Sequence, residues 1–174
     1  KEGPANSKLF QFNVWKYVKE NVVSFIYTIN QPGRSGLQSA FTNVSVYDDV
    51  FLDKLVDDYK FLDGDDMVSP SKKTVRKVQE VYIDVMNQEL ERTPVTFPVT
   101  TACLSVKEPG KEVEEWVVEK YGVDNSREDR FVIDSKFKEF IARKNLKWGF
   151  INIYQGDSST LSSCCFYGDE VIEV

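Results

Sequence analysis

The sequence contains no histidine among its 174 residues. Within these residues, this absence excludes Ser-His-Asp and Cys-His hydrolytic sites, histidine metal ligands and histidine acid–base catalysis. Any chemistry that the chain performs must therefore use carboxylates, Tyr, Lys or Arg, backbone groups or thiols.

Cysteine is also scarce, with three residues, of which Cys164 and Cys165 are adjacent. An odd count with one adjacent pair does not form the disulfide framework of a small secreted domain. Cysteine usage therefore predicts a reducing compartment, the cytoplasm.

Long apolar runs and a surplus of positive charge are missing as well. No run of about 18 apolar residues occurs, so we expect no transmembrane helix and no membrane partner. The net charge of −6 argues against a nucleic-acid partner but is compatible with a pocket for one nucleotide. No signal peptide is visible, although the start at Lys1 rather than Met indicates a piece of a longer protein.

What is present is a composition typical of one globular domain, or of a large part of one, with 41% hydrophobic and 29% charged residues. Hydrophobic spacing predicts helices and strands in alternation, which favours an α/β architecture with helical crossovers between strands. The helices are expected over 10–30, 70–93, 110–122 and 134–145, and the strands over 41–46, 95–106 and 147–156. Ser69 is expected to cap the second helix, and Gly122 to end the third.

Three stretches contain residues suited to chemistry, and each also has an ordinary structural interpretation. The segment "GRSGLQSAFTN" (33–43) combines glycines with Arg34, which suits an anion, but it lacks a Walker or dinucleotide spacing and is compatible with a simple turn. Cys103, in the apolar run 95–106, is interpreted as a core residue. Apart from these three stretches, the acidic segment 63–67 lacks calcium-loop spacing and is expected to be a solvated loop. No metal site is predicted.

The adjacent cysteines are the third stretch. A nucleophilic thiolate needs a lowered pKa, and no basic residue lies nearby in sequence. A thiol that donates a hydrogen atom or carries a radical needs no such partner, and a structural role for one cysteine remains an alternative. In a strand, only one of Cys164 and Cys165 would face a given cavity.

Three longer segments, taken in order, resemble one protein family. They are "NQPGRSGLQSAFTNVSVYD", "RTPVTFPVTTACLSV" and "KWGFINIYQGDSSTLSSCC". Together they are similar to the Gly-rich "GGQ-PFTN"-like segment, the "TFPI-T"-like strand and the "CCRL" strand of the anaerobic (class III) ribonucleotide reductase large subunit. The resemblance covers roughly residues 10–165. It predicts that "FTN", "FPVTT" and "NIYQG" form neighbouring parallel strands of one partial sheet.

The resemblance implies a partial ten-stranded α/β barrel of the glycyl-radical enzyme type. It implies reduction of ribonucleoside triphosphates to deoxyribonucleoside triphosphates by thiyl and glycyl radical chemistry, in which a thiyl radical takes the ribose 3′ hydrogen. Formate or a thiol would be the reductant. An iron–sulfur, S-adenosylmethionine-dependent activase would install the glycyl radical near the C-terminus of the whole enzyme, which is expected to be a homodimer. No cofactor is expected within these residues, which would be inactive alone.

Site residues follow from the same resemblance. Cys164 and Cys165 match the cysteine pair of the active-site strand, and either one is a candidate for the radical or a redox partner. A further cysteine on a finger loop downstream of these residues is the alternative radical site. Substrate-binding residues are expected in the "GQ-PFTN"-like segment, at Gln38, Ser39, Thr42 and Asn43. A non-catalytic nucleotide-binding or interaction domain that shares only the fold is the alternative.

The chain departs from the family after the cysteine pair, where Arg-Leu is expected and "FYGDEVIEV" stands. From Cys165 the sequence resembles the opening block of an intein, which would begin with an N-to-S acyl shift at that cysteine. Residues 1–164 would then belong to the reductase barrel and 165–174 to the intein. Continuation of the barrel strand through 165–174 is the alternative.

Overall fold

The computed structural model describes residues 4–31, 41–58 and 60–156. The chain divides into two compact units. One comprises residues 1–42 and 76–98, and the other comprises 43–75 and 99–174.

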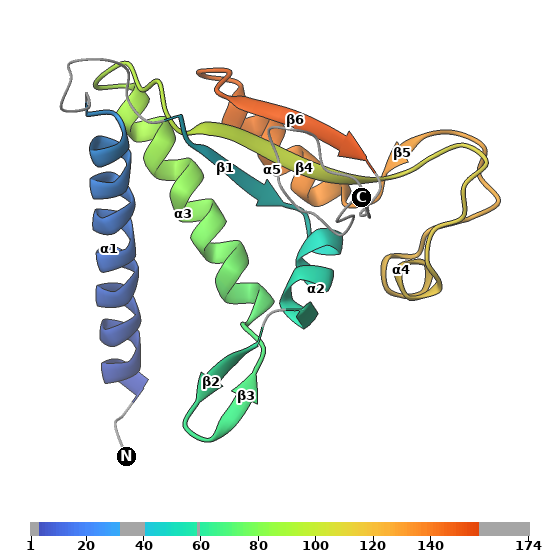
Figure 1. The fold of residues 1–174 in the computed structure, drawn as a ribbon, viewed down its shortest axis with the longest axis horizontal. Coiled ribbons are helices and arrows are strands. Elements are labelled where there is room, and N and C mark those ends of the chain that lie inside the picture. The colour runs from blue at the N-terminus through green and yellow to red at the C-terminus, as the bar shows by residue number, and fades with distance from the viewer. Residues whose placement is uncertain (1–3, 32–40, 59, 157–174) are drawn as a thin grey trace, which may run out of the picture. The chain divides into compact units, whose positions relative to one another are not determined.

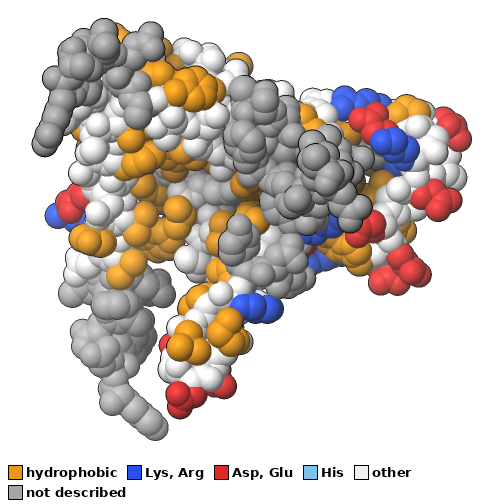
Figure 2. All heavy atoms as spheres, viewed as in Figure 1, with side chains coloured by type: hydrophobic (Ala, Val, Ile, Leu, Met, Phe, Trp, Pro, Cys, Tyr) orange, Lys and Arg blue, Asp and Glu red, His pale blue; other side chains and the backbone are white. Residues whose placement is uncertain are grey.

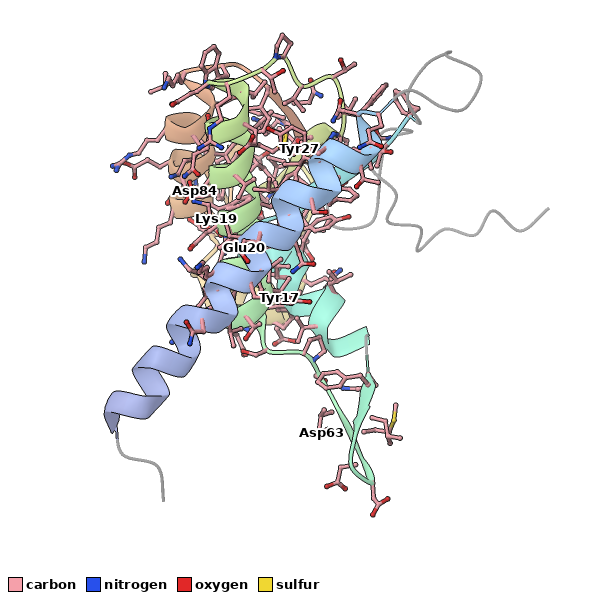
Figure 3. The ribbon with its side chains drawn as sticks, turned by 90° about the vertical axis from the view of Figure 1, so that its left-hand side faces the viewer. Tyr17, Lys19, Glu20, Tyr27, Asp63 and Asp84 are labelled. Atoms are coloured by element: carbon pink, nitrogen blue, oxygen red, sulfur yellow. The ribbon has the colours of Figure 1, made fainter. Side chains whose placement is uncertain are left out.

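The first unit is built from two long helices, α1 (Pro4–Ile29) and most of α3 (Lys72–Leu90). Near the end of α1, the Tyr27 hydroxyl donates a 2.8 Å hydrogen bond to the buried Glu89 of α3 (Figure 3). Asn30, just after α1, accepts bonds from the backbone amides of Thr96 and Phe97 through its Oδ1. These bonds use backbone groups that a strand would need, which explains why the strand predicted over 95–106 begins later.

The second unit is centred on three parallel strands (Figure 1). They are β1 (Asn43–Tyr47), β4 (Val99–Lys107) and β6 (Ile151–Gly156), and β4 lies between the other two. The three segments expected to be neighbouring parallel strands therefore do pair, which confirms that prediction. A short strand, β5 (Phe131–Val132), pairs antiparallel with the end of β4.

Helices α4 (Glu115–Tyr121) and α5 (Ser135–Asn145) lie between β4 and β6 in sequence. Gly122 ends α4 in the left-handed conformation with φ 66°, as the sequence predicts. Asp134 caps α5, because its side chain accepts the amide of Phe137. Phe137 and Ile141 are the buried residues of α5, which lies behind β4 in Figure 1.

The segment between β1 and α3 differs from the prediction. It contains a helix that the sequence reading missed, α2 (Asp49–Asp58), followed by a hairpin of β2 (Phe61–Asp63) and β3 (Asp66–Val68). The prediction of a loop over 63–67 is therefore wrong, because these residues form the hairpin, although they are exposed to solvent. Figure 2 shows apolar side chains along this hairpin and acidic ones at its tip.

The start of α3 is also corrected. Ser69 does not cap the helix, because the carbonyl of Ser71 accepts the amides of Thr74 and Val75. The Ser69 hydroxyl instead accepts a 2.5 Å hydrogen bond from Lys60 at the base of the hairpin. The predicted start is therefore two residues early.

Candidate functional site

One face of the parallel sheet carries a row of polar side chains. Ser45 of β1 is opposite Thr101 of β4, which is opposite Asn152 of β6, while Asn43 lies two residues before Ser45. Partners in register and residues two apart share a face of a sheet. We call these four residues the polar row: Asn43, Ser45, Thr101 and Asn152.

The other face of the same strands is mainly apolar. Val44 and Val46 of β1 alternate with the polar row, as do Ala102 of β4 and Ile151 and Ile153 of β6. Uncharged polar residues thus gather on one side of the sheet, although both faces of a parallel sheet are normally covered and apolar.

Two atoms of the polar row are buried without a hydrogen-bond partner. Within the part of the chain that the structure describes, neither Asn43 Oδ1 nor Thr101 Oγ1 has a partner, and Thr101 is 4% exposed. Asn43 and Ser45 are half-buried, whereas Asn152 on the outer strand is exposed. Solvent exposure along the polar row therefore increases from the buried Thr101 on β4 to the exposed Asn152 on β6.

On the same face, toward the carboxyl ends of the strands, aromatic residues follow the polar row. Tyr47, Cys103 and Tyr154 are aligned across the three strands, and Phe51 of α2 packs with them. Cys103 is completely buried in this cluster, which confirms that it is a core residue. A Cβ atom at position 156 would collide with the Tyr154 side chain, so Gly156 leaves room for that ring.

A buried carboxylate joins the carboxyl ends of β1 and β4. Asp48 accepts hydrogen bonds from the Ser105 amide at 2.6 Å, the Ser105 hydroxyl at 3.0 Å and the Phe51 amide at 3.0 Å. Burial outweighs these bonds and raises the pKa of Asp48 to about 6. The Asp49 amide donates to Asp134, the cap of α5, at 3.1 Å. These contacts hold α2 and α5 at the end of the sheet.

The predicted site residues are only partly covered by the described structure. Gln38, Ser39, Cys164 and Cys165 lie outside the described residues. Thr42 directly precedes β1, and Asn43 is its first residue.

The sequence reading missed the remaining three residues of the polar row. Ser45 and Asn152 each stand between two apolar residues, a period-two signal that is present in the sequence, whereas Thr101 directly follows Thr100. The run around Thr101 is so rich in apolar and β-branched residues that it indicated only a core strand.

Two properties of the described residues bear on the kind of site. No group of three or more Cys, Asp or Glu side chains there is arranged to hold a metal ion. None of the described helices is both long enough and apolar enough to cross a bilayer.

The fold and the polar row define a partial α/β barrel with a polar face. A sequence profile of the anaerobic ribonucleoside-triphosphate reductase family matches residues 13–167, and the chain belongs to this family. This confirms the family that the three sequence segments suggested. Among curated protein sequences, none matches this chain.

Solved structures support the same assignment. The anaerobic ribonucleotide reductase of Thermotoga maritima with dATP in its specificity site aligns with TM-score 0.62 and 25% identity, over 82% of this chain and 20% of that one. The same reductase in complex with dATP and CTP aligns with the same TM-score, identity and coverage. Its form with glycerol in the active site aligns with TM-score 0.63 and 24% identity, over 84% of this chain and 20% of that one.

These alignments confirm the α/β class and the partial barrel of the glycyl-radical enzyme type. The chain spans about a fifth of the length of the solved reductases that it matches.

Proposed function

We propose that the full-length protein reduces ribonucleoside triphosphates to deoxyribonucleoside triphosphates, and that residues 1–164 form part of its catalytic barrel. The observation that carries the proposal is the pairing of β1, β4 and β6. Three family-like segments separated by long stretches of sequence become adjacent parallel strands, as a shared active site requires. The family match supports the same activity.

The chemistry would run on cysteine radicals. A thiyl radical takes the 3′ hydrogen of the ribose, so that a C–H bond breaks and an S–H bond forms, and the 2′ hydroxyl then leaves as water. With formate as reductant, the ribonucleotide, formate and a proton give the deoxyribonucleotide, carbon dioxide and water. A thiol reductant is the alternative. This chemistry explains how a chain without histidine can belong to an enzyme.

The residues in the proposed roles come from both ends of the chain. Cys164, with the cysteine that follows it in the mature enzyme, supplies the active-site thiols. Gln38 and Ser39, with Thr42 and Asn43 at the start of β1, bind substrate. The stored glycyl radical and the surface for its iron–sulfur activase belong to the rest of the protein, which we propose to be a cytoplasmic homodimer. The present piece alone is therefore inactive.

The test is anaerobic turnover of the full-length protein after activation, measured as dCTP formed from CTP. We expect formation of dCTP with one equivalent of oxidised reductant. A protein that binds CTP and forms no dCTP after radical installation is instead a non-catalytic nucleotide-binding protein.

We also propose that Cys165 begins an intein. Its thiol would attack the carbonyl carbon of Cys164, so that a C–S bond replaces the peptide C–N bond and the freed amine takes a proton. Cys164 would be the last host residue, and the residue after the intein would restore the cysteine pair. The departure of "FYGDEVIEV" from the family pattern supports this proposal.

Sequencing of the gene beyond Val174, with the mass of the expressed protein, tests the intein. Splicing blocks containing His and a terminal Asn, followed by resumed reductase sequence and a spliced mass, are expected. Direct continuation into reductase sequence would reject the intein and leave the reductase proposal intact.

A further inference from the structure

Two hydrogen-bond acceptors stand unpaired on one face of the sheet. Asn43 Oδ1 and Thr101 Oγ1 are both closed to solvent, and neither has a partner within the described residues. Register places them on the same face, with Ser45 between them on β1. Leaving a buried polar group unsatisfied costs about 1–3 kcal/mol, so two on one face require a hydrogen-bonding partner in the working protein. The Asn43 oxygen needs a donor, whereas the Thr101 hydroxyl can accept or donate.

The chemistry of the row restricts what that donor is. All four residues of the polar row are uncharged, being two amides and two hydroxyls. An amide oxygen accepts hydrogen bonds and does not donate them. A phosphate offers acceptor oxygens and no proton at neutral pH, so it cannot pair with the Asn43 oxygen. The polar row therefore suits a ligand that presents hydroxyl groups.

We propose that the polar row binds a ribose hydroxyl of the nucleotide, and that Thr101 is the residue that distinguishes a ribonucleotide from a deoxyribonucleotide. This inference rests on the proposed function and adds residues that the sequence segments did not indicate. Thr101 is 4% exposed, so a hydroxyl that reaches its Oγ1 is bound away from water. A site built around a hydroxyl discriminates strongly against an analogue that lacks it, because its buried polar groups are left unpaired.

The adjacent residue provides a matched control. Thr100 lies on the same strand, is completely buried and points to the opposite face, where it is aligned with Val44 and Ile151. Thr100 has interactions of its own in the structure, unlike Thr101 Oγ1. Threonine and valine have nearly the same shape, so Thr→Val at either position replaces the hydroxyl by a methyl group and removes its hydrogen bonds.

The experiment compares the full-length wild-type protein with its Thr101→Val, Thr101→Ser and Thr100→Val variants. Affinity for CTP, 2′-deoxy-CTP and 3′-deoxy-CTP is measured by calorimetry without radical activation, and thermal stability by scanning calorimetry. We expect Thr101→Val to weaken CTP binding about tenfold, as loss of a neutral hydrogen bond does. Its affinity for the analogue lacking the recognised hydroxyl should be unchanged. Thr101→Ser should restore CTP binding.

The melting temperature distinguishes a role of Thr101 in nucleotide binding from a role in stabilising the fold. Thr101→Val should leave the melting temperature unchanged or raise it, whereas Thr100→Val should lower it and leave affinity unchanged. If Thr101→Val lowers the melting temperature and does not alter CTP affinity, the donor comes from the protein and the inference is overturned. Equal weakening of CTP and both analogues would also overturn it. Because binding is measured without turnover, a protein that binds as expected but forms no dCTP contradicts only the proposed function.

Discussion

Asp48 shows how one buried side chain organises the end of the sheet. Its carboxylate accepts from Ser105 on β4 and from Phe51 in the first turn of α2, so it joins a strand end to a helix start. The side chain is completely buried. Its position immediately after β1 makes it part of the framework that supports the polar row.

The raised pKa of Asp48 predicts a pH dependence of stability. The folded-state pKa of about 6 lies above the 3.8 of an unperturbed aspartate, so the folded protein holds this proton more tightly than the unfolded chain. The stabilising contribution is complete below about pH 4 and is lost as the pH rises through 6. It amounts to about 3 kcal/mol by linkage.

Denaturant unfolding of the full-length protein between pH 4 and pH 7 measures this effect. Asp48→Asn should remove the decrease in unfolding free energy over that range. The matched control is Asp63→Asn, which changes an exposed carboxylate on the hairpin (Figure 3). If the unfolding free energy of Asp48→Asn depends on pH as that of the wild type does, burial does not raise the pKa of the Asp48 carboxyl.

At the scale of elements, the end of α4 is set by a single backbone conformation. Gly122 has φ 66°, and its amide donates to the carbonyl of Val118 at 3.0 Å. Glycine adopts this left-handed conformation without the steric cost that other residues meet. Gly122→Ala should lower the unfolding free energy by about 1 kcal/mol.

Gly122→Asn is the comparison for this prediction, because asparagine tolerates the left-handed region better than alanine. We expect a smaller loss for asparagine in denaturant unfolding. Equal stability of the alanine variant and the wild type would contradict the assigned cap.

The elements also show what the sequence can and cannot predict. The long helices and the strands β1, β4 and β6 were predictable because their periodicity is clear over many residues. The hairpin around Gly64 is a very short pairing, and the hydrogen bond from the Asp49 amide to Asp134 joins residues far apart in sequence, so neither has a clear sequence signal. Of the polar row, only Asn43 was predicted as a site residue, because the sequence of a strand does not tell which of its polar side chains will lack a partner.

At the scale of the whole molecule, the parallel sheet is incomplete as a unit. Within the described residues, β1 and β6 each pair only with β4, so both outer strands have an unpaired edge. A strand edge with unpaired N–H and C=O groups can pair with a further strand. The chain spans about a fifth of the solved reductases, whose remaining length has room for the strands that complete the barrel.

We propose that this sheet belongs to an enzyme that reduces ribonucleotides by means of an active-site cysteine. The most direct test is anaerobic dCTP formation from CTP by the activated full-length protein and its Cys164→Ser variant, with Thr100→Val as a control for disturbance of the sheet. We predict turnover in the wild type, retained turnover in Thr100→Val and a loss of at least about a thousandfold in Cys164→Ser, since a hydroxyl does not replace the thiol in radical transfer. Turnover in Cys164→Ser at the wild-type rate would contradict the proposed role of Cys164 in radical transfer.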